Sequence, residues 1–204
     1  MLEIYLCRHG QSQANADGIL AGHMDSPLNM HGREQAQELG GLAKKAGLVF
    51  DYIYCSPLSR AKETATIIAG LTGSPEPKVM DDLKERDFGI LTGKPYQDIP
   101  KYATKLLQPG KIGYFLNGEG VETFPQVLKR AQKVLDTIHE NHKTGKVLLA
   151  THGDFGMMLF AAFHKKSWRD TLAHFHFGNS DLLLLKEDLH HQPHVFKINQ
   201  RGVY

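Results

Sequence analysis

The sequence predicts an α/β fold: a three-layer sandwich whose central, mostly parallel mixed sheet is flanked by helices. Short apolar runs bounded by polar residues or glycine, typical of buried strands, occur at 2–6, 52–55 and 147–150. Longer segments between them repeat apolar residues every three or four positions, as helices with one buried face do. Two further strands are expected at 181–186 and 194–199. Elements of both kinds along one chain favour a sheet that is covered by helices.

Two helices are predicted in the first half of the chain. The first extends from a cap at Asn29 to Gly47. Its buried face carries Ala36, Leu39, Ala43 and Ala46. The second follows the strand at 52–55, with Ser56 as its cap and Pro57 at its first position. Its buried face carries Leu58, Ala61, Ala65, Ile68 and Leu71.

Two more helices flank the strand at 147–150. Thr123 and Gln126 form the pattern of a capping box, and the helix that starts there is expected to end near Lys143. Its apolar stripe consists of Phe124, Val127, Leu128, Ala131, Val134, Leu135 and Ile138. The helix after the strand buries Phe155, Met158, Leu159, Ala162 and Phe163. Met157 is interpreted, like Met158, as filling the core.

Three segments contain enough glycine and proline to interrupt regular structure. Residues 10–28 are predicted to form a loop, and a loop of this length in a compact domain usually has a function. Residues 73–82 form a connection that contains Pro75 and Pro77. Residues 94–121 are expected to hold only short helical stretches.

The composition is that of a globular protein, and we expect one domain over residues 1–204. Hydrophobic residues make up 41% of the chain and charged residues 23%, which is ordinary for such a domain. The 24 basic side chains nearly balance the 22 acidic ones, and the net charge of +2 creates no field that would recruit nucleic acid or an acidic membrane surface. We expect neither as a partner. The sequence is compatible with a homodimer and does not decide the oligomeric state.

Cys7 and Cys55 are expected to be reduced and buried, because they lack the spacing of a paired motif. The chain enters a strand within two residues and contains no apolar run of 18 residues, which predicts a cytoplasmic protein. The 12 histidines call for a metal check at two places, His174 with His176 and the group of His190, His191 and His194. These lack the carboxylates or thiolates of a recognisable zinc or iron site, so we expect no metal and no cofactor.

Arg8 and His9 are expected at the carboxyl end of the first strand, where open α/β sheets bind ligands. An imidazole in this position can attack phosphorus while a guanidinium group binds phosphate oxygens. A single Arg-His-Gly triplet also occurs in structural and surface roles. His152, followed by Gly153, repeats the arrangement after the strand at 147–150. Two such pairs that converge on one crevice favour the functional interpretation.

Four other residues fit an anion site or its chemistry but have ordinary alternatives. Arg60 is predicted in the first turn of a helix, where its charge opposes the helix dipole unless an anion binds there. Ser12 and Asn15 offer a hydroxyl and an amide to phosphate oxygens, or else serve ordinary turns. Glu85 stands beside Arg86, and such a pair is usually a surface salt bridge.

Together these motifs resemble the histidine phosphatase superfamily, the phosphoglycerate mutase-like group. They occur in the family's order: Arg8-His9-Gly10-Gln11-Ser12 with Asn15, Ser56-Pro57-Leu58-Ser59-Arg60-Ala61, Leu83-Lys84-Glu85-Arg86-Asp87-Phe88-Gly89 and Thr151-His152-Gly153. The resemblance implies that His9 is the nucleophile and Glu85 the proton donor. It places Arg8, Arg60 and His152 around the transferred phosphoryl group.

The resemblance also implies the substrate contacts and the activity. Backbone amides near Ala21 and Gly22, together with Gly153, are expected to bind the substrate, and the insertion at 94–121 to cover the site and help select it. The expected activity is metal-independent hydrolysis of small phosphorylated metabolites through a phosphohistidine. The cationic setting, which includes a protonated His152 on one interpretation, would keep the nucleophilic imidazole neutral.

Two alternatives remain, a phosphoglycerate mutase and a non-catalytic module that binds phosphorylated ligands. A mutase must hold a second anionic group, but the insertion at 94–121 contains lysines and no arginine. Asp154 stands where the resembling mutases have an asparagine, and its carboxylate would repel that group unless it points away. A binding module would have lost the nucleophile or the acid, and both are present. The phosphatase is therefore favoured.

Overall fold

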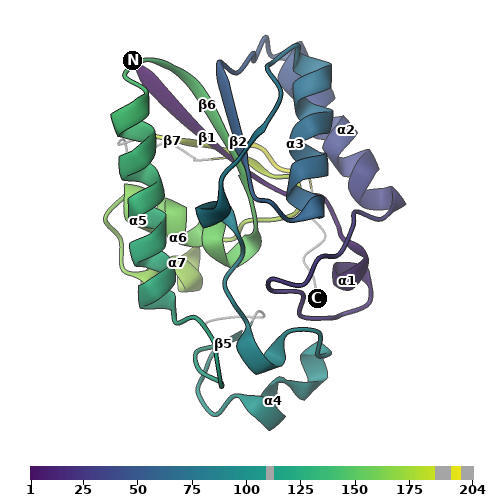
Figure 1. Ribbon diagram of the computed structural model, residues 1–204, viewed down its shortest axis with the longest axis vertical. Coiled ribbons are helices and arrows are strands. Elements are labelled where there is room, and N and C mark those ends of the chain that lie inside the picture. Colours follow the sequence, from purple (N-terminus) through teal and green to yellow (C-terminus); the bar gives the residue numbers. More distant parts are fainter. Residues whose placement is uncertain (109–112, 187–193, 199–204) are drawn as a thin grey trace.

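In the part of the chain that the computed structural model describes, residues 1–108, 113–186 and 194–198, six strands form one central sheet (Figure 1). Their order across the sheet is β3-β2-β6-β1-β7-β8. The strands are β1 (Leu2–Arg8), β2 (Tyr52–Cys55), β3 (Lys78–Val79), β6 (Gly145–Thr151), β7 (Leu182–Leu185) and β8 (His194–Phe196). β7 is antiparallel to both of its neighbours, and the other pairs are parallel. The mostly parallel mixed sheet is confirmed, and Asn199 of the last predicted strand lies outside the described residues.

Helices cover both faces of this sheet, which confirms the three-layer sandwich (Figure 1). One face is covered by α2 (Met30–Lys45) and α3 (Ser59–Thr72), the other by α5 (Phe124–Asn141), α6 (Gly153–Phe163) and α7 (Trp168–His174). Successive residues of a strand point to opposite faces and so supply two cores. In β1, Ile4 and Leu6 pack with α5 and α6, whereas Tyr5 and Cys7 pack with α2 and α3.

Two helices begin at the caps that the sequence predicts. The Asn29 side chain accepts a hydrogen bond from the Gly32 amide at the start of α2. Thr123 and Gln126 form the predicted capping box of α5. These caps satisfy amides that the first turn of a helix leaves without an intrahelical acceptor.

α3 begins two residues later than predicted. Leu58 occupies its cap position and the helix starts at Ser59, so the assignment of Ser56 as the cap was wrong. The Ser56 hydroxyl instead lies 2.8 Å from Nε2 of the buried His152. Arg60 remains in the first turn of the helix.

The segments rich in glycine and proline contain short elements that sequence periodicity did not reveal. A single-turn helix, α1 (Gln13–Ala16), interrupts the predicted loop, and the edge strand β3 lies in the predicted connection. The segment 94–121 is called the cap below, and its described residues, 94–108 and 113–121, lie at the carboxyl end of the parallel strands (Figure 1). The described part of the cap contains α4 (Ile99–Tyr102) and a hairpin of β4 (Leu106–Leu107) and β5 (Tyr114–Phe115). Three 3-10 turns complete this end of the fold: Asp81–Leu83, Gly89–Leu91 and Tyr96–Asp98.

Cys7 and Cys55 are buried free thiols, as expected. Both lie opposite Ala150 in the register of β6, one on each side. Two strand spacings, about 10 Å, separate their backbones. This exceeds the reach of a disulfide. Within the described ranges, none of the helices has both the length and the apolar character that a membrane crossing requires.

Candidate active site

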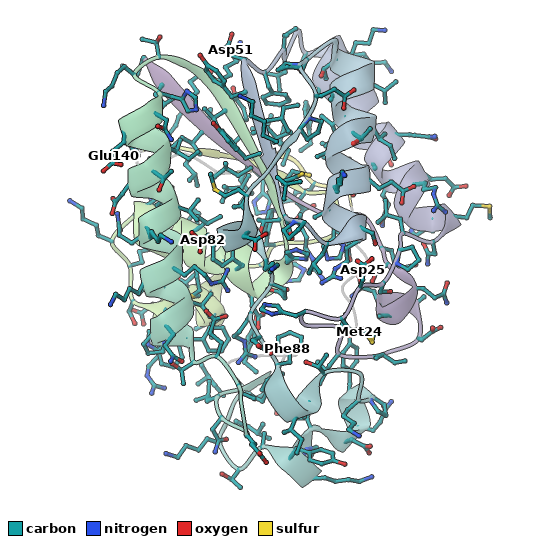
Figure 2. The ribbon with its side chains drawn as sticks, in the orientation of Figure 1. Met24, Asp25, Asp51, Asp82, Phe88 and Glu140 are labelled. Atoms are coloured by element: carbon teal, nitrogen blue, oxygen red, sulfur yellow. The ribbon has the colours of Figure 1, made fainter. Side chains whose placement is uncertain are left out.

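The parallel register of β1 and β6 brings the two His-Gly pairs together. Arg8 at the end of β1 lies opposite Thr151 at the end of β6, so His9 and His152 leave the sheet side by side. Their ring centroids are 5.0 Å apart. Phe88 and Met24 lie at this end of the molecule, whereas Asp51 lies at the opposite end (Figure 2).

The hydrogen bonds of His9 fix its tautomer and its position. Its Nδ1 lies 2.6 Å from the carbonyl oxygen of Gly10, which can only accept, so Nδ1 carries the proton and Nε2 carries a lone pair. The Arg60 Nε donates to that Nε2 at 3.3 Å. The backbone is held on both sides, because Asn179 Nδ2 donates to the His9 carbonyl and the Gly10 amide donates to Thr64 Oγ1.

His9 and His152 are both neutral imidazoles. Burial is the largest cause that holds the pKa of His9 well below its ordinary value, followed by the charges of Arg60 and Arg8. Burial and then Arg60 lower the pKa of His152 in the same way. The interpretation that a protonated His152 helps to keep His9 neutral is therefore wrong. Burial is the largest cause of the lowered pKa of His9.

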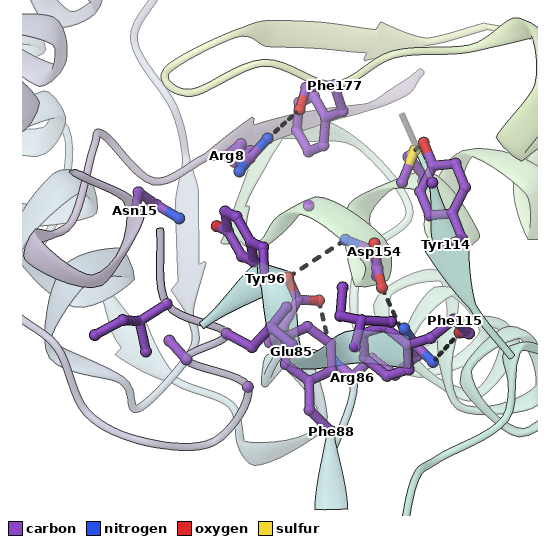
Figure 3. A pocket seen from close by; sticks show the side chains of 18 of the residues that line it. Arg8, Asn15, Glu85, Arg86, Phe88, Tyr96, Tyr114, Phe115, Asp154 and Phe177 are labelled. Atoms are coloured by element: carbon purple, nitrogen blue, oxygen red, sulfur yellow. Dashed lines mark hydrogen bonds and ion pairs between the residues drawn. The ribbon is translucent and has the colours of Figure 1, made fainter. Parts of the chain in front are cut away.

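Arg8 and Arg60 are both buried, and both line a cavity at the end of the sheet. Arg8 Nη1 donates to the Phe177 carbonyl at 2.7 Å (Figure 3). Arg60 donates through Nη1 to the Met24 carbonyl and through Nη2 to the Gly22 carbonyl. These hydrogen bonds go to neutral carbonyl oxygens, so the two guanidinium groups keep their positive charges in the cavity wall. Two positive charges side by side suit a phosphate group.

Glu85 is buried at the start of α6. Its carboxyl group accepts hydrogen bonds from the amides of Arg86, Phe155 and Asp154, the last at 3.3 Å (Figure 3). Burial, and next the charge of Asp154, raise the pKa of this carboxyl despite those donors. The alternative of a surface salt bridge between Glu85 and Arg86 is wrong, because both side chains are buried and the guanidinium group points elsewhere.

Arg86 is a buried residue whose place in the site the sequence did not reveal. Its Nε lies 2.8 Å from Asp154 Oδ2, and its exposed side-chain fraction is 1%. The guanidinium group also lies over three aromatic rings, those of Phe88, Phe115 and Phe124, at 5.1, 4.1 and 4.3 Å from their centroids. Of the partners of Arg86, only Phe88 lies near it in the sequence. Phe115, Phe124 and Asp154 come from distant segments, so no local pattern could reveal the arrangement.

The cavity has a volume of about 490 Å³. It brings together most of the predicted site residues: Arg8, His9, Asn15, Ala21, Gly22, Arg60, Glu85 and Gly153. Ser12 is not among the lining residues, because its hydroxyl and amide form a capping box with Asn15 at α1. His152 is not among the lining residues either, and its ring lies next to that of His9. Met157, interpreted as core, also lines the cavity.

The described residues contain no group of three or more histidines, cysteines or carboxylates arranged to hold a metal ion. His174, His176 and His194 belong to this part of the chain. His190 and His191 lie outside the described residues.

The chain belongs to the histidine phosphatase superfamily (branch 1), whose family model matches residues 4–199. It is 31% identical over 175 residues to the 2,3-bisphosphoglycerate-dependent phosphoglycerate mutase of Parvibaculum lavamentivorans, with 83% of each chain covered. It is 35% identical over 159 residues to the metal-independent phosphoserine phosphatase of Arabidopsis thaliana, covering 74% of this chain and 64% of that relative.

A solved structure of phosphoserine phosphatase from Entamoeba histolytica, in complex with 3-phosphoglyceric acid, is also similar. The TM-score is 0.71 at 26% sequence identity, and 90% of each chain is covered. The relatives thus include phosphatases and a mutase. The similarity to these relatives supports a phosphatase or mutase activity. The choice between the two depends on the residues that line the cavity.

Proposed function

We propose that the protein is a metal-independent phosphatase that hydrolyses small phosphorylated metabolites through a phosphohistidine on His9. One observation carries the proposal. The neutral His9 presents a lone pair on Nε2 beside two buried guanidinium groups, in a cavity that also contains Glu85, a carboxyl with a raised pKa. A nucleophile, an acid and the charge to stabilise a phosphoryl group are thus assembled in one place.

The reaction proceeds in two steps. His9 Nε2 attacks phosphorus, the bond from phosphorus to the leaving oxygen breaks, and protonated Glu85 gives its proton to that oxygen, so the alcohol leaves. Water then attacks the phosphohistidine while Glu85 takes a proton from it. The bond from phosphorus to nitrogen breaks, inorganic phosphate leaves, and both residues return to their starting states.

Arg8 and Arg60 stabilise the negative charge on the transferring phosphoryl oxygens. The hydrogen bonds of His152 suggest that it too contacts the phosphoryl group. We assign to His152 the tautomer in which Ser56 Oγ, which accepts from the Leu58 amide, donates its own proton to His152 Nε2. This leaves the proton of His152 on Nδ1, a buried atom that lacks a hydrogen-bond partner in the described residues. An unsatisfied buried donor is costly, and a phosphoryl oxygen would satisfy it.

Hydrolysis is favoured over the mutase reaction by the charges of the cavity. A mutase must bind a second anionic group. Asp154 lines the cavity but is paired with Arg86, so each compensates the charge of the other. Lys94, Lys101 and Lys105 of the cap are absent from the described lining residues, and Lys111 lies outside the described part. The lack of a further cation among the described lining residues therefore disfavours a mutase more than repulsion by Asp154 does.

The deciding experiment follows the phosphate of 3-phosphoglycerate in the presence of 2,3-bisphosphoglycerate. Release of inorganic phosphate supports the phosphatase. Fast interconversion of the 2- and 3-phospho isomers with little release would establish the mutase instead. A module that binds without catalysis would show neither, and it has no support from a site that retains both His9 and Glu85.

A further inference from the structure

We propose that the preferred substrates are phosphate monoesters of hydrophobic alcohols, whose apolar part packs against the cap. The inference rests on the proposed phosphatase function and extends it from the reaction to the leaving group. The cavity combines two kinds of lining: the charged groups of Arg8, Arg60 and Glu85 together with the Arg86–Asp154 ion pair, and a set of apolar side chains called the apolar wall below.

The apolar wall comes from three segments of the chain. Leu20 and Ile19 come from the loop after β1, Phe88 follows the Glu85 segment, and the cap adds Ile99 and Phe115. Tyr96, Tyr114 and Met157 also line the cavity. Most of these residues belong to the small core under the cap, in which Leu20, Phe88 and Phe115 are at least nine-tenths buried. The wall is therefore a packed surface that is already built before a ligand binds.

The rings of this wall are held from behind. Phe88 and Phe115 meet edge to face with centroids 5.1 Å apart, and the buried Arg86 guanidinium lies over both. A Cβ at Gly22 would approach the Phe88 ring to 3.0 Å, so the loop after β1 closes against it. A rigid aromatic wall loses little conformational entropy when an apolar group packs on it.

Among the described lining residues, no cation remains at the wall to bind a second anion. Arg8 and Arg60 lie beside His9 and serve the phosphoryl group, while Arg86 is neutralised by Asp154. His176 also lines the cavity, and partial desolvation of its ring, followed by the charge of Arg8, lowers its pKa. The polar lining groups next to the wall residues are Gln97 and the hydroxyls of Tyr96 and Tyr114. They would replace only part of the hydration that a polar or anionic leaving group loses there. The volume of about 490 Å³ lies well within the range of roughly 300–1,000 Å³ typical of small-molecule sites.

The test compares ethyl, butyl and hexyl phosphate, whose leaving oxygens differ little in reactivity. We expect kcat/KM to rise roughly threefold for each added methylene while the chain stays on the wall. Propyl phosphate should also exceed glycerol 3-phosphate, which has the same carbon count. A flat series, or faster hydrolysis of glycerol 3-phosphate, would overturn the inference and leave the phosphatase function intact. Failure to hydrolyse any of these esters or 4-nitrophenyl phosphate would overturn both.

A pair of variants locates the effect on the cap. Ile99→Lys places a cation on the wall and should lower kcat/KM for hexyl phosphate at least tenfold while it raises that for 3-phosphoglycerate. Ile99→Ala should lower only the hexyl phosphate value, by a few fold. Leu106→Lys makes the same change in the cap at a residue that is 52% exposed and does not line the cavity, so both values should stay unchanged. Equal effects of the two lysine variants would contradict the proposal.

Discussion

His9 and His152 are two buried imidazoles whose protonation is coupled to folding. Burial and Arg60 hold the pKa of each well below the ordinary value. In the unfolded chain both protonate near that value, about 6.5. Because the folded-state pKa is the lower one, the stabilisation is complete above about pH 6.5 and is lost as the pH falls below it.

We therefore expect His152→Asn to flatten the pH dependence of stability. Between about pH 6.5 and 5 the wild type should lose about 1.4 kcal/mol of unfolding free energy per pH unit more than the variant, the linkage of one titrating group. Urea unfolding at several pH values measures this. His31→Asn is the matched control, because that side chain is 60% exposed, and it should keep the wild-type slope. A wild-type slope in His152→Asn would show that this imidazole does not titrate on unfolding.

Glu85→Gln removes the proposed acid while it keeps the shape of the side chain. The rate toward alkyl phosphates should fall by roughly 10²- to 10⁴-fold, the usual worth of a positioned general acid. Substrates with good leaving groups, such as 4-nitrophenyl phosphate, need little protonation and should lose less. Equal losses on both kinds of ester would exclude Glu85 as the acid.

Asp154 is expected to adjust the pKa of Glu85 without touching the reacting atoms. Its charge is the second cause, after burial, that raises the Glu85 pKa, and it also neutralises Arg86. Asp154→Asn should therefore lower that pKa and shift the basic limb of the kcat/KM profile toward lower pH. Asp81→Asn, at a carboxylate that is 77% exposed, is the control and should leave the profile in place. An unmoved basic limb in Asp154→Asn would contradict the assignment.

At the scale of elements, the turn between β2 and α3 shows why a local pattern can mislead. The Ser-Pro pair has the form of a helix start, but the structure uses the Ser56 hydroxyl for His152 and begins α3 at Ser59. The hydroxyl still accepts from the Leu58 amide, as a capping side chain would, and it also supplies the buried imidazole with a partner for Nε2. The local pattern gave no sign of this second, tertiary contact.

Ser56→Ala should therefore destabilise the fold by about 1–3 kcal/mol, the cost of leaving a buried polar atom without its partner. Turnover should fall as well, because His152 loses the contact that fixes its tautomer. Ser59→Ala is a matched control: its buried hydroxyl has no hydrogen-bond partner in the described ranges, so its removal should cost little. Chemical denaturation of both variants checks the difference, and similar losses would refute the role given to Ser56.

The cap illustrates what periodicity cannot reveal. Its strands β4 and β5 have two residues each, too few for an alternating pattern to be read. α4 has four residues and follows directly on a 3-10 turn. The sequence predicted short helical pieces and missed the hairpin. Tyr96, Ile99 and Phe115 of this segment line the cavity, and its role in covering the site stays a prediction.

At the scale of the whole molecule, the sheet topology explains why so much of the site could be predicted. Two strands that run parallel and adjacent must end at the same edge, so His9 and His152 meet once β1 and β6 are neighbours. The sequence signals for these strands are short apolar runs, and the structure confirms both strands. Arg60 was predicted from its place in the first turn of a helix, where its charge opposes the dipole unless an anion binds, and the structure confirms that place.

The remaining site residues could not be predicted because their meaning depends on distant partners. Arg86 and Asp154 are 68 positions apart and form an ion pair only after α6 docks beside the Glu85 segment. Asn179 reaches the backbone of His9 across 170 positions. Ser180 adopts a φ of 56° in the turn that supplies these contacts, and its amide donates to the Arg8 carbonyl. No local pattern encodes such convergence.

The measurement that tests the central claim most directly is the trapping of the phosphoenzyme. Labelled substrate is mixed with the enzyme and quenched in alkali within one turnover, and the protein is then mapped by peptide. The account predicts acid-labile, alkali-stable label on His9, with no label and no turnover in His9→Ala. Label on Ser12, or full turnover by His9→Ala, would contradict it.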